Sequence, residues 1–174
     1  MKSSTHRMTY YSKLINHTTA PGKKVYLYQP NASGLVKVHQ KHGKKGNCPQ
    51  GFNNLKPGDI IALHQKGKTP YVVTHIVEVL DNGVQFEPQS TPFNYVRECK
   101  VLAYLDPTKA PTNPIIGEEG TYEVLNGFSG VTMQDAYSPA YFYVGNGHVH
   151  QFIPVDYKTL IKLAKSHPHY TFVN

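Results

Sequence analysis

Tryptophan is absent from this chain of 174 residues, and cysteine is nearly so, with only Cys48 and Cys99. Two cysteines are too few for a disulfide framework, or for a zinc site built from cysteine alone. No apolar run approaches the roughly 20 residues that a membrane span requires. The N-terminus also lacks the apolar core of a secretory signal. We therefore expect a soluble, cytoplasmic protein without a membrane partner.

Acidic residues are scarce in the first part of the chain. Residues 1–68 contain 12 of the 18 lysines and arginines but a single acid, Asp59, which gives a formal charge of +11. Residues 69–174 contain 6 basic residues and 10 acids, which gives −4. If folding keeps the basic residues together, this asymmetry steers a polyanion toward the N-terminal half. Phosphate contacts of this kind provide affinity but carry no sequence information.

The basic half contains a lysine-rich loop within residues 37–64. Its lysines include Lys41, Lys44 and Lys45, and Lys56 follows in a Pro-Gly turn that leads into an apolar strand. Glycines and an aromatic residue accompany these charges, a combination typical of surfaces that bind anionic, stackable ligands. The pattern favours nucleic acid, although a solvated loop that only happens to carry lysines has the same composition.

Thirteen prolines and 14 glycines interrupt the chain, which favours a β-rich fold over a helical bundle. An alternating or β-branched composition predicts strands over residues 23–29, 59–65, 70–80 and 93–105. Asp81-Asn82-Gly83 predicts a hairpin turn after the third of these strands. The later strands together predict an antiparallel meander that could curl into a barrel.

A single domain is expected over residues 23–174, after a polar leader, residues 1–22, that is flexible or loosely docked. An apolar stripe predicts a helix over residues 156–166, and His167-Pro168 ends it. Residues 34–39 are compatible with a short strand or with a helical turn. The chain contains no internal repeat, and its sequence does not determine the oligomeric state.

Four segments within residues 23–165 resemble, in the right order, the EVE domain family. They are GNCPQGFNNLKPGD, LKPGDIIALHQKGKTPYVVTHIVEVL, FNYVRECKVLAYL and YFYVGNGHVHQFIPVDYKTLIKL. The resemblance implies an α+β, β-rich fold: a PUA-like small mixed β-barrel with short flanking helices and a C-terminal helix, related to YTH and ASCH domains. It also implies non-catalytic binding of DNA or RNA, with a base, often modified, taken into a pocket with a basic rim.

The same resemblance assigns a pocket to the predicted first strand. Tyr26 and Tyr28 stand where the family often presents Tyr-Trp, and alternation along a strand places both on one face. Asn31 and Ser33 would donate or accept hydrogen bonds at a base edge. Family members usually use tryptophan near the pocket, so tyrosine would have to supply the stacking surface here. The alternative is that both tyrosines pack the barrel.

The basic loop would complete that pocket. Phosphates would be held by Lys41, Lys44, Lys45 and Lys56, and a base would stack against Tyr28 and Phe52. Cys48-Pro49 lies in the same loop, so we expect both residues at the interface. Arg97, in the strand over residues 93–105, would reach phosphate or form a surface ion pair with a neighbouring glutamate.

Two other function classes remain open. A hydrolase or nuclease would use Cys48 as nucleophile, or a metal held by His148 and His150, which alternate on a short strand. The sequence names no third metal ligand, and no paired carboxylates or catalytic triad accompany these residues, so we expect no cofactor and no catalysis. A protein-interaction module would instead use exposed tyrosines as a docking patch.

Overall fold

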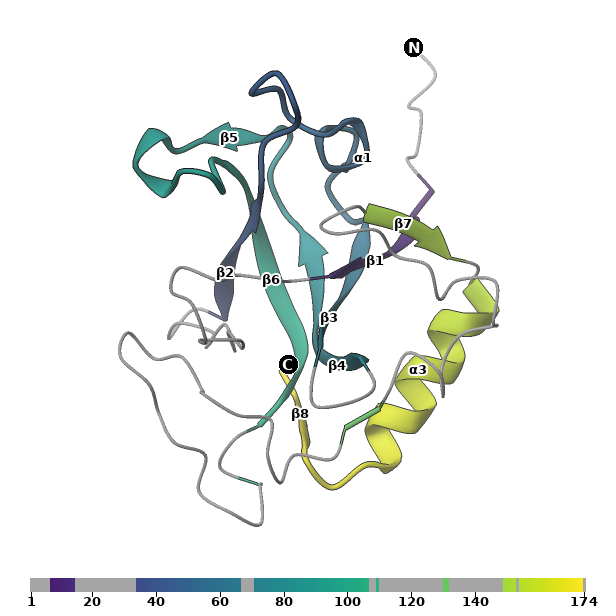
Figure 1. The fold of residues 1–174 in the computed structure, drawn as a ribbon. Helices are drawn as coiled ribbons and strands as arrows, with labels where there is room; N and C mark the ends of the chain where they lie inside the picture. The colour runs from purple at the N-terminus through teal and green to yellow at the C-terminus, as the bar shows by residue number, and fades with distance from the viewer. Residues whose placement is uncertain are drawn as a thin grey trace.

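The computed structural model describes residues 7–14, 34–66, 71–106, 109, 130–131, 149–152 and 154–173 (Figure 1). In this part of the chain eight strands form one mixed sheet, accompanied by short helical elements. The strands are β1 (Tyr10–Leu14), β2 (Leu35–Gln40), β3 (Ile60–Lys66), β4 (Tyr71–Val79), β5 (Gln85–Phe86), β6 (Tyr95–Leu105), β7 (Val149–Phe152) and β8 (Tyr170–Phe172). The helices are α1 (Gln50–Asn53), the 3-10 turn η1 (Pro88–Ser90) and α3 (Pro154–Ser166).

The eight strands and few helices make the fold α+β and β-rich, as expected. The main path runs β2-β6-β4-β3-β1-β7, with β5 and β8 also paired to β6. Strands β1 and β3 are parallel, whereas the other pairs are antiparallel. Within the described residues β2 and β7 are the two ends of the path and do not pair with each other, so closure into a barrel stays a prediction.

Strand β1 comes from the segment expected to be a leader. Tyr10–Leu14 lies between β3 and β7 in the interior of the sheet, and the backbone N–H of Ile60 donates to the carbonyl of Thr9. A segment hydrogen-bonded on both sides belongs to the fold, so the described part of the expected leader contributes an interior strand. The strand predicted over residues 23–29 lies outside the described residues.

The longest strand, β6, organises much of the sheet. Along one of its edges it pairs with β2 and then with β8, and along the other with β5 and then with β4. Strand β5 therefore continues β4 along the same edge of β6 and does not fold back on β4. The hairpin predicted at Asp81-Asn82-Gly83 is therefore wrong, because β4 and β5 do not pair with each other. The carboxylate of Asp81 instead accepts the backbone N–H of Glu98 on β6. The chain reverses later, between β5 and β6.

The core occupies both faces of β3. Ile60 and Ala62 belong to one buried cluster, and Ile61 and Leu63 belong to a second one. Because side chains alternate along a strand, the two clusters lie on opposite sides of β3. Helix α3 covers the first cluster through Leu160 and Ala164, whereas α1 contributes Phe52 to the second. The other buried members of the second cluster are Val36, Val38, Leu55, Val77, Val79, Cys99 and Val101.

The C-terminal helix confirms the prediction made from its apolar stripe. Leu160 and Ala164 are one turn apart and fully buried, while Lys158, Lys162 and Lys165 are exposed. This amphipathic pattern accounts for one helical face packing on the sheet and the other facing water. Among the described residues, no helix has both the length and the apolar character needed to cross a membrane.

Candidate functional site

The part of the lysine-rich loop that carries Lys41, Lys44 and Lys45 joins β2 to α1, and its own backbone hydrogen bonds shape it. The N–H of Gly43 donates to the carbonyl of Asn47 at 2.7 Å, and the N–H of Gly46 donates to the carbonyl of Gly43 at 3.0 Å. Gly46 has φ = +75°, a left-handed conformation that glycine adopts without steric cost. The loop is therefore a compact turn that presents its lysines in a defined arrangement.

The hairpin between β5 and β6 holds this loop from the side. The hydroxyl of Tyr95 donates to the carbonyl of Gly46 at 2.6 Å, and the N–H of His42 donates to the carbonyl of Pro92 at 3.1 Å. Segments separated by about fifty residues in sequence thus lie side by side at one end of the sheet (Figure 1). Neither contact is visible in the sequence pattern.

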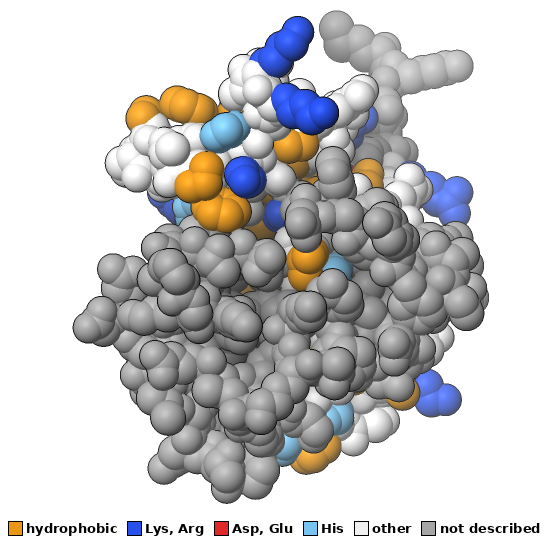
Figure 2. Space-filling view, in the orientation of Figure 1, with side chains coloured by type: hydrophobic (Ala, Val, Ile, Leu, Met, Phe, Trp, Pro, Cys, Tyr) orange, Lys and Arg blue, Asp and Glu red, His pale blue; other side chains and the backbone are white. Residues whose placement is uncertain are grey.

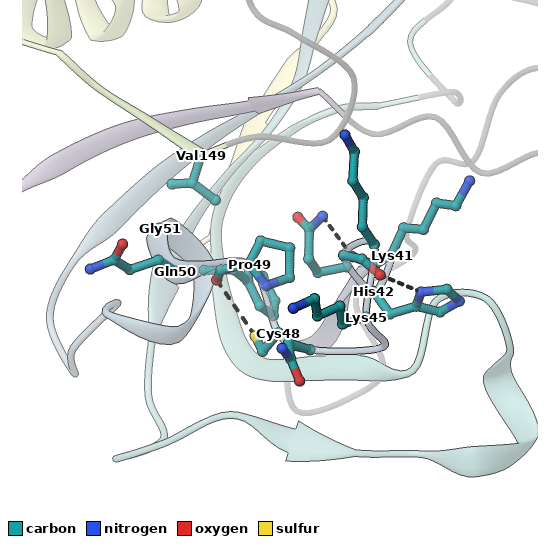
Figure 3. A pocket seen from close by; sticks show the side chains of 13 residues that line it. Lys41, His42, Lys45, Cys48, Pro49, Gln50, Gly51 and Val149 are labelled. Carbon is teal, nitrogen blue, oxygen red and sulfur yellow. Dashed lines mark hydrogen bonds between the residues drawn. The ribbon is translucent and has the colours of Figure 1, made fainter.

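An open pocket of about 970 Å³ lies between this loop, α1 and β7. Figure 3 shows Lys45, Cys48 and Pro49 along the loop side and Val149 of β7 across from them. The described lining contains lysine, amide, glycine and apolar residues, and no acidic side chain: Gln40, Lys41, His42, Gly43, Lys44, Lys45, Asn47, Cys48, Pro49, Gln50, Gly51, Phe52 and Val149. Such a lining suits an anionic ligand with an apolar part.

The three predicted lysines of the loop are available to a ligand. Lys41, Lys44 and Lys45 are exposed, and no ion pair involves them within the part of the chain that the structure describes. Lys37 differs, because its Nζ lies 2.7 Å from the Glu87 carboxylate. That hydrogen bond raises the pKa of Lys37 and lowers the pKa of Glu87. The free positive charge of the loop is thus concentrated at the pocket.

Phe52 does not have the predicted role. Its side chain is 0% exposed, packed in the core cluster with Leu55, Ile61 and Leu63. The short helix α1 directs this ring inward because its burial removes a large apolar surface from water. No ring face is left for a base, which corrects the expected stacking on Phe52. The ring forms part of the floor of the pocket.

Arg97 is the second correction. It is fully buried, its Nε donates to the Asp81 carboxylate at 2.5 Å, and its Nη1 donates to the carbonyls of Leu55 and Phe52 at 2.8 and 3.3 Å. A buried guanidinium needs this compensation, since an unpaired charge in the interior is costly. The side chain is neither a phosphate contact nor a surface pair. It ties β6 to the turn that follows α1.

Cys48 and Pro49 line the pocket as expected, but the thiol is not activated. Cys48 is partly buried, and this burial raises the pKa of its thiol, with a smaller opposing effect from Arg97. A nucleophilic cysteine requires the opposite, a thiol ionised near neutral pH. Cys48 therefore lines the pocket with a thiol whose pKa is raised by burial.

Lys56 is exposed but lies apart from the described lining of the pocket. Its turn is stabilised by Asp59, whose carboxylate accepts the backbone N–H groups of Lys56 at 2.8 Å and Thr9 at 3.1 Å. Asp59 therefore has a structural role in this turn, and Thr9 links the turn to the start of β1. The structure thus separates Lys56 from the other three lysines.

Sequence reasoning missed Lys13, a buried lysine of β1 beneath the pocket. Its Nζ donates to Oε1 of Gln40 at 2.7 Å and lies 5.7 Å from the centre of the Phe52 ring. Both Gln40 and Phe52 line the pocket. Burial lowers the pKa of Lys13 to about 7. The available signal was an apolar and aromatic setting around a lysine, Tyr10 to Leu14, within an otherwise polar segment.

The remaining candidates fall outside what can be described. Tyr26, Tyr28, Asn31, Ser33 and His148 lie outside the described residues, and only the backbone of His150, in β7, is described. Among the residues that the structure does describe, no group of three histidine, cysteine or acidic side chains is arranged to hold a metal ion.

No protein-family model matches the chain, and no curated protein matches it. A solved structure described as a hypothetical protein from Leishmania major is similar, with a TM-score of 0.56. The likeness covers 92% of this chain and 96% of that one, at 9% sequence identity. At this identity the likeness concerns the fold alone.

Proposed function

We propose that this protein is a non-catalytic nucleic-acid-binding domain that holds phosphates on the loop between β2 and α1. The observation that carries this proposal is the pocket with Lys41, Lys44 and Lys45 at its rim and no acid in its described lining. These lysines are exposed on a loop whose backbone is already ordered, so binding does not have to order the loop. Figure 2 places several of the blue lysine and arginine side chains together at this end of the molecule.

The pocket itself supports a ligand that is more than a phosphate. Pro49 and Val149 give it an apolar part, while Asn47 and Gln50 offer amide donors and acceptors. A base has an apolar face and a polar edge, and this lining offers contacts to both. Single strands are the cheaper ligand, because a base within a duplex must first be unstacked and unpaired.

The resemblance stated above extends this proposal. We propose a PUA-like barrel of the EVE type, with the pocket reading a base, modified or unmodified, in DNA or RNA, inside the cell. The mixed β-rich sheet and its C-terminal helix α3 support this finer assignment. The predicted contributions of Tyr26, Tyr28, Asn31 and Ser33 belong to it, and each is testable by substitution.

Binding is tested by fluorescence anisotropy with labelled single-stranded DNA and RNA, at salt concentrations from ~50 to ~200 mM. We expect measurable binding at low salt and a steep loss of affinity as salt rises, because lysines release counterions from phosphate. Duplexes and strands with modified bases, measured beside them, report strand and base preference. Absence of binding at low salt, or affinity independent of salt, would rule out the proposal.

A matched control separates local from global charge. Lys158, Lys162 and Lys165 are exposed on α3, away from the pocket lining, and are equal in number to the lysines of the loop. Changing these three to glutamine alters the net charge as much as the same changes in the loop. We expect a small effect on affinity from the helix variant and a large one from the loop variant.

A further inference from the structure

Phe86 is an exposed aromatic residue that the proposed function has not used. Its side chain is 58% exposed, and it is the one aromatic among the strongly exposed large hydrophobic residues of the described part of the chain. A lone exposed apolar residue needs no explanation. Phe86 requires one because of the residues that surround it.

Three cross-strand neighbours lead from Phe86 to the pocket. Phe86 of β5 lies opposite Tyr95 of β6, and Tyr95 lies opposite Gln40 of β2. Residues directly opposite each other point to the same side of a sheet, and two strand spacings amount to roughly 10 Å. Gln40 lines the pocket, and the rings of Phe86 and Tyr95 are in edge contact with centroids 5.4 Å apart.

Tyr95 also connects this row to the positive charge. Its hydroxyl donates to the carbonyl of Gly46, the residue directly after Lys44 and Lys45. Tyr95 therefore contacts both the exposed ring of Phe86 and the loop that carries the lysines. In Figure 2, orange hydrophobic side chains and blue lysine or arginine side chains lie next to one another at this end of the molecule.

Hydrogen bonds hold the strand that carries Phe86. The next residue, Glu87, accepts from Lys37 at 2.7 Å and from Ser90 at 3.0 Å. The amide of Asn94 donates to the carbonyls of Glu87 and Pro88 at 3.0 and 3.2 Å, closing the hairpin. The backbone that carries the ring is therefore held in place before a flat ligand stacks on it, and the Tyr95 ring contacts one edge of it, which favours binding.

We propose that Phe86 is a base-stacking platform, so that a single strand runs from the lysine-rich loop across Tyr95 and stacks one base on the Phe86 ring. The inference rests on the proposed function, and it replaces Phe52 with a ring that is exposed. Charge complementarity selects the occupant, since an exposed ring beside three free lysines matches a polyanion with aromatic bases.

The test uses the absence of tryptophan from the chain. In a Phe86→Trp variant the new indole is the sole tryptophan, and stacking of a base quenches its fluorescence directly. Phe86→Leu keeps the apolar bulk but removes the aromatic face. The probes are oligothymidylate and an abasic strand of the same length, titrated at low salt. Phe86 is exposed, so we expect both variants to fold, and circular dichroism checks this.

We expect oligothymidylate to quench Phe86→Trp, and Phe86→Leu to lose roughly ten-fold in affinity for oligothymidylate but not for the abasic strand. The salt dependence of Phe86→Leu should equal that of the unaltered protein, because no charge has changed. Salt-dependent binding with no quenching and no loss in Phe86→Leu would overturn the platform and leave the proposed function standing. No binding by the unaltered protein would overturn both.

Discussion

Two sets of basic side chains lie close together in this fold and behave differently. Lys41, Lys44 and Lys45 are exposed on the loop after β2, whereas Lys13 and Arg97 are buried in the strands beneath it. The buried pair is committed to internal partners, Gln40 for Lys13 and Asp81 for Arg97. The loop lysines have no ion-pair partner in the described part of the chain.

The comparison shows that a count of basic residues overstates the charge available to a ligand. Arg97 is neutralised by Asp81, and Lys37 is paired with Glu87 at the surface. Among the exposed lysines, Lys41, Lys44 and Lys45 share one loop beside the pocket, whereas Lys158, Lys162 and Lys165 are spread along α3. Folding has thus divided the basic residues into a structural group and a group that can bind a ligand, and each group can be tested separately.

The largest effect is expected from Arg97→Met. This change leaves the Asp81 carboxylate without its guanidinium in a mostly buried position and releases the carbonyls of Phe52 and Leu55. We expect the free energy of unfolding to fall by about 3–5 kcal/mol, measured by urea denaturation. Lys100→Met on the same strand, half-buried and outside this network, is the control. A loss below about 1 kcal/mol for Arg97→Met would contradict the structural role.

Lys13 predicts a pH dependence of stability. Burial lowers its pKa to about 7 from the usual 10.5, so between these pH values the unfolded chain binds more protons than the folded one. Stability should therefore rise with pH across this window, and the penalty for burying the charge is fully present below pH 7. A Lys13→Met variant does not titrate there. The unfolding free energy of the variant minus that of the unaltered protein should fall by about 4 kcal/mol from pH 6 to pH 10.

The difference between the two proteins isolates Lys13, because tyrosines and other groups that titrate at alkaline pH contribute equally to both. It also cancels any constant cost of leaving Gln40 without its lysine partner. Parallel stability profiles over the whole pH range would show that Lys13 does not carry a depressed pKa in the folded state.

Tyr95→Phe should have a smaller effect and should link the two groups. The change removes the hydroxyl that donates to the Gly46 carbonyl but keeps the ring in contact with Phe86. We expect about 1 kcal/mol less stability and a few-fold weaker oligonucleotide binding, because one of the two hydrogen bonds that hold the loop from the side is lost. Unchanged binding would indicate that the loop keeps its arrangement without this anchor.

Cys48→Ser should have the smallest effect. The raised pKa of the thiol means that Cys48 is mostly unionised near neutral pH. We expect binding to change less than about two-fold and thiol-specific reagents to react slowly at pH 7. Rapid modification of Cys48 at that pH, or a hydrolytic activity lost in the serine variant, would favour the enzymatic alternative.

The sequence predicted the regular elements better than the contacts between them. The β-branched runs identified β3, β4 and β6, and the apolar stripe identified α3, because these patterns follow directly from strand and helix periodicity. The turn at Asp81 was misread because the Asp81 side chain bonds β6, a partner remote in sequence. Residues 34–39, left open between strand and helical turn, fall in β2.

Within the described part of the candidate site, the exposure of the loop lysines was predictable from the sequence and the burial of Phe52 was not. Exposure of lysines on a glycine-rich loop follows from composition, so Lys41, Lys44 and Lys45 were found. The burial of Phe52 depends on how α1 packs against β3, and that of Arg97 depends on a distant aspartate. The sequence gives no local sign of either. Lys13 escaped notice because its segment resembles a solvated leader until β3 and β7 enclose it.

The central claim is that the exposed lysines of the loop bind phosphate. The most direct test is the slope of log affinity against log salt for single-stranded oligonucleotides, compared between the unaltered protein and a Lys41→Gln, Lys44→Gln, Lys45→Gln variant. Each lost phosphate contact reduces the slope by about 0.7 for a single strand, so the variant should be shallower by about two. Equal slopes, or a larger change in the matched α3 variant, would contradict the claim.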